Sequence, residues 1–100
     1  MTKENKSTVS VLLEAEKVLA FNVLKAAFAS TSEEARLKQF KFVASSITSI
    51  ITVHRSLYPK DLESISHWQE LFASTVNAVA KTERTLNLER RIAAMKEKDG

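Results

Sequence analysis

Two histidines and the carboxylates near them are the side chains of this sequence best suited to chemistry. Glu63 lies four residues before His67 and Glu70 lies three residues after it, so all three would share one face of a helix. An imidazole and two carboxylates could hold a divalent cation or form a pH-sensitive patch, although a metal would need a further ligand. Charged helix faces produce such triplets by chance, so we interpret this one as solvated surface and predict no metal site.

The other polar side chains do not combine into a catalytic group. His54 falls among apolar residues with no partner for catalysis beside it, which favours a buried or half-buried histidine bonded to a neighbour. The many Ser and Thr hydroxyls show no Ser-His-Asp pattern and are better explained as helix caps and polar surface. The chain has no Cys and its single Gly is residue 100, which excludes thiolate chemistry and phosphate-binding glycine loops. We therefore predict a protein that is not an enzyme and needs no cofactor.

Basic residues offer a different chemistry, the binding of phosphates. Those that gather near the C-terminal end are Lys81, Arg84, Arg90 and Arg91. Acidic residues alternate with them, and over the whole chain 15 Lys and Arg accompany 12 Asp and Glu, for a net charge of +3. No zinc finger, helix-turn-helix turn or RNA-binding aromatic motif accompanies them. We interpret these residues as a salt-bridged helix surface, and keep an oligomeric nucleic-acid-binding protein as the alternative.

The composition indicates which elements must position these side chains. At 100 residues, with 44% apolar and 27% charged, the chain is expected to form one domain over residues 1–100, frayed at 1–7 and 97–100. Hairpins need residues that tolerate positive φ, and a chain with one Gly and one Pro has almost none. Helices joined by short polar loops have no such need. We therefore predict an all-α fold, an antiparallel three-helix domain with an extended C-terminal helix.

Hydropathy and cysteine content bear on location. The longest uncharged stretch, residues 42–53, is 12 residues long, whereas a membrane span needs roughly 20. Charged residues interrupt the apolar run that follows the basic start of the chain, so no signal-peptide pattern develops. With no Cys, we expect a cytoplasmic protein that does not bind membranes.

The first helix is expected over residues 9–29. Its apolar residues cover most of the helical circumference instead of forming one stripe, and even its narrow polar face carries Phe21 and Phe28. A three-helix monomer cannot easily cover a helix of this kind. We therefore expect Phe21 and Phe28 to contact another protein molecule.

The second helix is expected to begin at a capping box formed by Thr31 and Glu34 and to end before Pro59. Between them a three-four spacing predicts a coiled-coil-like seam, flanked by Val43, Ile50 and Leu57. The seam residues are Leu37, Phe40, Ala44, Ile47, Ile51, His54 and Tyr58.

The third helix is expected to begin between Pro59 and Ser66, with Asp61 or Ser66 as its cap, and to run to about residue 97. At about 100° per residue, the apolar residues near its end lie roughly 160° around the helix from Leu86, which continues the earlier stripe. These displaced residues are Leu88, Ile92 and Met95. Either the helix kinks near Asn87, or its last turns leave the bundle and contact something else, which is the interpretation we favour.

Residues 75–91, with the sequence TVNAVAKTERTLNLERR, resemble the oligomerising helices of phage small terminase subunits. The resemblance covers under a fifth of the chain, and we carry no residue role over from it. It is consistent with the nucleic-acid alternative. The apolar surplus instead predicts a homo-oligomer or a protein-binding module that works as a regulator, inhibitor or structural factor, with contacts at Phe21, Phe28, Leu88, Ile92 and Met95.

Overall fold

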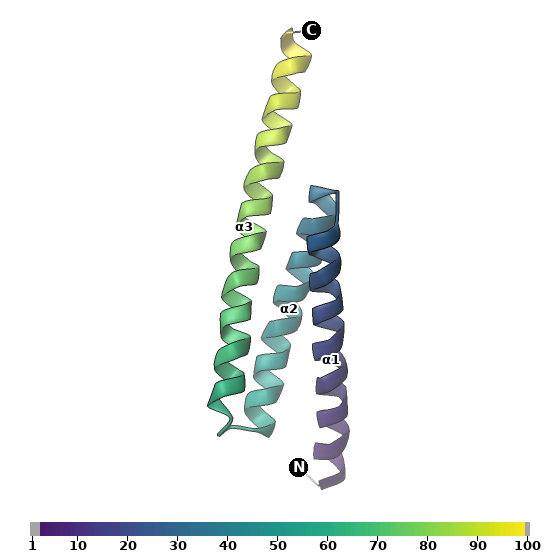
Figure 1. Cartoon of the computed structure of the whole chain (residues 1–100), viewed down its shortest axis with the longest axis vertical. Helices are drawn as coiled ribbons and strands as arrows, with labels where there is room; N and C mark the ends of the chain where they lie inside the picture. The colour runs from purple at the N-terminus through teal and green to yellow at the C-terminus, as the bar shows by residue number, and fades with distance from the viewer. Residues whose placement is uncertain (1–2, 100) are drawn as a thin grey trace.

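The computed structural model describes the backbone of residues 3–99 and the side chains of residues 6–98. It contains three α-helices, α1 over Lys3–Ala29, α2 over Glu33–Leu57 and α3 over Leu62–Asp99, and no strand within the described residues (Figure 1). The predicted antiparallel three-helix architecture with a long last helix is confirmed. Helix extends through residues 3–7 and 97–99, where we expected frayed ends, and residues 1–2 and 100 lie outside the described part.

In the turn between α1 and α2, side chains form hydrogen bonds with the unpaired backbone groups at the two helix ends. Ser32 is the N-cap of α2, and its hydroxyl accepts a hydrogen bond from the backbone N–H of Ala35. The expected capping box at Thr31 is therefore wrong by one residue, since the extended backbone at Ser32 places its oxygen at the open N–H groups. Arg36 reaches back to the end of α1, where its guanidinium donates to the carbonyl oxygens of Ala27 and Ser30.

The reversal between α2 and α3 follows the expected chemistry. Helix α2 ends at Leu57, because Pro59 disfavours the helical conformation at Tyr58, which adopts φ −132° and ψ 67°. Asp61 caps α3, accepting a hydrogen bond on Oδ1 from the backbone N–H of Ser64 at 3.3 Å. Of the two expected caps, Asp61 is the one used.

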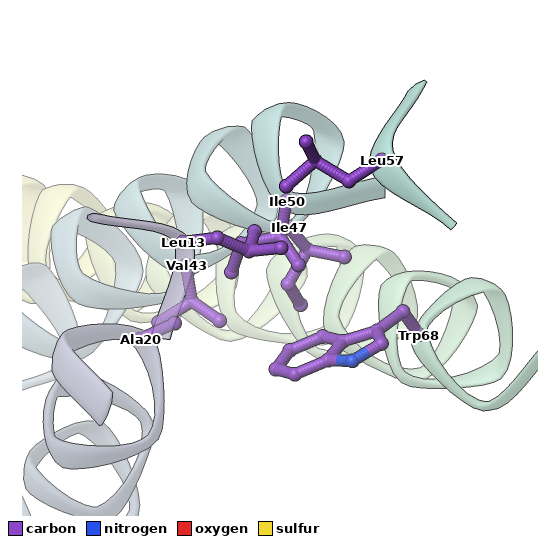
Figure 2. Packing of buried hydrophobic residues seen from close by; sticks show 7 residues of the cluster. All are labelled: Leu13, Ala20, Val43, Ile47, Ile50, Leu57 and Trp68. Atoms are coloured by element: carbon purple, nitrogen blue, oxygen red, sulfur yellow. The ribbon is translucent and has the colours of Figure 1, made fainter. Parts of the chain in front are cut away.

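The core lies along α2, which packs against both other helices, whereas the backbones of α1 and α3 stay further apart (Figure 1). The Phe21 ring of α1 contacts Trp68 of α3. Figure 2 shows the main cluster of the core, which consists of Leu13, Ala20, Val43, Ile47, Ile50, Leu57 and Trp68. The expected seam is therefore rotated, since Val43, Ile50 and Leu57 are buried and Ala44, Ile51 and Tyr58 are only half-buried. The rotation arises because α2 faces two helices at once, so the centre of its buried side lies between the two directions of contact.

Helix α3 continues past the rest of the bundle as one unbroken helix over Leu62–Asp99, which includes Asn87 (Figure 1). Arg90 lies beside Glu34 in the first turn of α2, with 3.9 Å between Nη2 and Oε1. The nine residues from Arg91 to Asp99 therefore project about 14 Å beyond that level, at a rise of 1.5 Å per residue. No helix among the described residues is long and apolar enough to cross a membrane.

Candidate protein-interaction surfaces

The side of α1 that faces away from the bundle is apolar and exposed. Leu13, Ala20 and Ala27 form its buried side. Around the rest of the circumference, eight exposed residues form what we call the outer face of α1: Val11, Leu12, Ala15, Val18, Leu19, Asn22, Ala26 and Ala29. Leu12, at its edge, lines a groove with Ile50 and Val53 of α2. Leu12 is 63% exposed although it adjoins the core residue Leu13. An apolar helix surface of this length without a covering element is typical of an interface.

Phe21 and Phe28 lie at the rim between α1 and α3. The Phe21 ring packs at a tilt on Trp68 with 5.3 Å between centroids, and Phe28 meets Phe40 edge-on at the same distance. Phe28 nevertheless remains 69% exposed, beside a small apolar cavity of about 60 Å³ that Leu71 also lines. Each ring therefore makes an aromatic contact within the bundle, which the sequence pattern alone did not indicate.

The displaced stripe near the end of α3 is solvent-exposed, with Leu88 at 59% and Met95 at 64%. We call Leu88, Ile92 and Met95 the end face of α3. They lie on the opposite side of the helix from Leu86, the last buried residue of the stripe that packs on α2. The five residues expected to form the interface therefore belong to two separate regions.

The basic residues near the end of the chain do not form one group. At about 100° per residue, Lys81, Arg84 and Arg91 lie on the same side of α3 as Leu88, and all are exposed. Arg90 lies on the other side, where it approaches Glu34. The end face of α3 is thus bordered by three cations, and Arg90 contributes to the bundle instead.

A polar cluster inside the bundle links all three helices. Lys17 Nζ donates to His54 Nδ1 at 3.3 Å, and His54 Nε2 lies 3.0 Å from Asp61 Oδ2. Because an ammonium group only donates, Nδ1 must accept, so His54 in this network carries its proton on Nε2 and donates it to Asp61. This bond, with those from Ser64, holds the pKa of Asp61 below its ordinary value. As expected, His54 is a buried histidine bonded to its neighbours.

Lys17 has two further partners. Its Nζ donates a hydrogen bond to Glu14 Oε1 at 3.0 Å and lies 5.9 Å from the centroid of the Trp68 ring. These contacts attach α1 to α2 and α3 through one side chain. Because the cluster joins Lys17 of α1 to His54 of α2 and to the start of α3, its geometry fits a structural role in holding the helices together.

Glu63, His67 and Glu70 line a shallow open depression on α3, and the His67 ring lies edge-on to Trp68. Among the described residues, no three His, Asp or Glu side chains are placed to hold a metal ion. The interpretation of this triplet as solvated surface stays a prediction.

The sequence pattern singles out Phe21 and Phe28 on the first helix and none of the aliphatic residues of the outer face of α1. In the structure, Val11 and Leu12 are exposed to a similar extent as the two rings. The sequence signal for this face is the three-four spacing of Leu12, Ala15, Leu19, Asn22, Ala26 and Ala29.

Comparison of the chain with protein-family models, curated proteins and solved structures gave no match.

Proposed function

We propose that this chain is a self-associating helical interaction module that acts by binding other protein surfaces and not by catalysis. The observation that carries the proposal is the exposure of two separate apolar regions, the outer face of α1 and the end face of α3. Exposed apolar residues that adjoin one another on a helix are stabilised when another protein surface covers them.

The end face of α3 has the features of a helix that docks into a groove. Leu88, Ile92 and Met95 follow the three-four spacing with which one side of a helix inserts into an apolar groove. Their side of α3 also carries Lys81, Arg84 and Arg91. We propose that the partner is a protein whose apolar groove has an acidic rim, which would complement this pattern.

The double substitution Leu88→Asp with Ile92→Asp tests this role. We expect it to abolish capture of the protein partner or to lower the oligomeric mass by light scattering, while helix content by circular dichroism stays unchanged. The matched control is Asn77→Asp with Asn87→Asp, which adds the same charge at exposed α3 positions without removing apolar groups. If mass and partner capture are unchanged in the Leu88 and Ile92 variant, the end face does not have this role.

The alternative function, oligomeric nucleic-acid binding, is favoured by the common side of α3 that Lys81, Arg84 and Arg91 share. Oligomerisation would bring several such triplets together and strengthen their field. DNA or RNA affinity that falls steeply as salt concentration rises would support this function. Absence of binding at low salt would exclude it.

A further inference from the structure

The outer face of α1 contains a regular seam of exposed residues, with Leu12 at its edge beside Ile50 and Val53 of α2. Its members alternate at spacings of three and four residues, the heptad pattern of paired helices. They are Leu12, Ala15, Leu19, Asn22, Ala26 and Ala29, and all six are exposed. Three of them are alanines, whose small side chains allow another helix to approach closely. The seam therefore has the spacing and the shape that a second helix requires.

The seam is complementary to itself in the antiparallel direction. If a second α1 lies antiparallel with the two-fold axis at Leu19, then Leu12 faces the partner's Ala26, and Ala15 comes within one residue of the level of the partner's Asn22. Each large residue away from the axis then meets a small one, as close packing requires. In a parallel pair, alanines would face alanines and Asn22 would face its own copy, which leaves space unfilled.

The charges beside the seam favour the same direction. Glu14 and Lys25 are three helical turns apart, so they lie on the same side of α1, with the turn that holds Leu19 about midway between them. An antiparallel partner would bring its Lys25 toward Glu14 at one end and its Glu14 toward Lys25 at the other. A parallel partner would place each charge near its own copy. The flexible stem of Lys25 can lie along Val11 of the other chain while its ammonium reaches the carboxylate.

We propose that two copies of this chain form an antiparallel dimer through the outer faces of α1, with Leu19 of each copy at the two-fold axis. The inference rests on the self-association in the proposed function and names its partner as a second copy of the chain. In this dimer the projecting ends of α3 point in opposite directions. Both end faces therefore stay open to other partners.

Cysteine cross-linking tests the arrangement cleanly, because the natural chain contains no Cys. In the full-length protein, Leu19→Cys places two thiols at the axis, within the Cα separation of about 7 Å that a disulfide spans. Ala29→Cys places them about 30 Å apart in an antiparallel pair, at 1.5 Å per residue, but next to each other in a parallel pair. Ser66→Cys, exposed on α3, reports random collision.

Under mild oxidation we expect a cross-linked dimer from the Leu19 variant and background levels from the other two. Cross-linking of the Ala29 variant above the Ser66 background would overturn the antiparallel arrangement. A multimeric wild-type protein whose Leu19 variant does not cross-link would overturn the α1 interface while leaving self-association intact. A wild-type protein that is monomeric at every concentration would overturn the dimer and the self-association together.

Charge exchange gives a second readout that does not depend on thiols. We expect Lys25→Glu to shift the mass toward monomer, because two carboxylates then meet at each end of the interface. The double variant Glu14→Lys with Lys25→Glu restores opposite charges across the interface but removes the carboxylate that accepts from Lys17. Its matched control is therefore Glu14→Lys alone, and we expect the double variant, but not this control, to regain the dimer. Failure of the double variant to recover mass, with helix content intact, would contradict the proposed contact between Glu14 and the partner's Lys25.

Discussion

Substitution of a core aliphatic residue and of an exposed one on the outer face of α1 should affect stability in different ways. Ile47 is 0% exposed in α2, within the cluster formed with Leu13, Ala20 and Trp68 from the other helices. Leu12 is 63% exposed and has no such enclosure. The comparison of Ile47→Ala with Leu12→Ala therefore separates folding from association.

The magnitudes follow from burial. Ile47→Ala removes fully enclosed carbon atoms and leaves a cavity, which costs about 2–5 kcal/mol, whereas Ile47→Val should cost roughly 1 kcal/mol. The total stability of such a domain is about 5–15 kcal/mol, so the alanine variant loses a large part of it. In an isolated monomer, Leu12→Ala should change the free energy of unfolding by at most about 0.5 kcal/mol.

Thermal unfolding at several protein concentrations is the assay. We expect Ile47→Ala to lower the Tm by at least about 8 °C at every concentration, since 1 kcal/mol corresponds to roughly 4–8 °C in a domain of this size. The Tm change of Leu12→Ala should be visible in concentrated samples and should vanish on dilution, because association stabilises the fold by mass action.

Two results would refute this reasoning. A change of less than about 1 kcal/mol for Ile47→Ala would mean that Ile47 is not enclosed by all three helices. A Leu12→Ala effect that is large and independent of concentration would mean that Leu12 belongs to the monomer core, and the outer face of α1 would then not be a surface for association.

Two further predictions concern the helix ends. Ser32→Ala should destabilise the protein by about 1 kcal/mol in urea unfolding, because it removes the N-cap of α2. Thr31→Ala should have almost no effect on the free energy of unfolding. If Thr31→Ala destabilises the protein more than Ser32→Ala does, Thr31 is the N-cap of α2 and the capping box with Glu34 is correct. For Asp61, the folded-state pKa is lowered, so its stabilising contribution is complete above the unfolded value of about 3.9 and is lost as pH falls through the folded value. Urea unfolding at a series of acidic pH values should show a shallower loss of stability for Asp61→Asn than for the natural protein, and equal slopes would disprove a stabilising hydrogen bond from His54 to the Asp61 carboxylate.

Local chemistry decided much of the fold, and these features were readable from the sequence. Pro59 ends α2 because its ring acts on the residue directly before it, and Asp61 caps α3 through an N–H group three residues away. The scarcity of Gly excluded hairpins by the same kind of local argument. The exposure of Leu88, Ile92 and Met95 was also predictable, because a long third helix outruns its two neighbours.

Only the tertiary structure decided which side of each helix is buried. Helix α1 is apolar around most of its circumference, so its pattern did not show that Leu13 would face inward and Leu12 outward. The choice depends on the direction of α2, which contacts α1 on one side and α3 on the other. The same arrangement brought Lys17, His54 and Asp61 together and turned Arg90 toward Glu34. The contacts of Lys17 with His54 and of Arg90 with Glu34 join residues far apart in the chain. Their free energy depends on how three helices pack together, which the periodicity of a single helix does not contain.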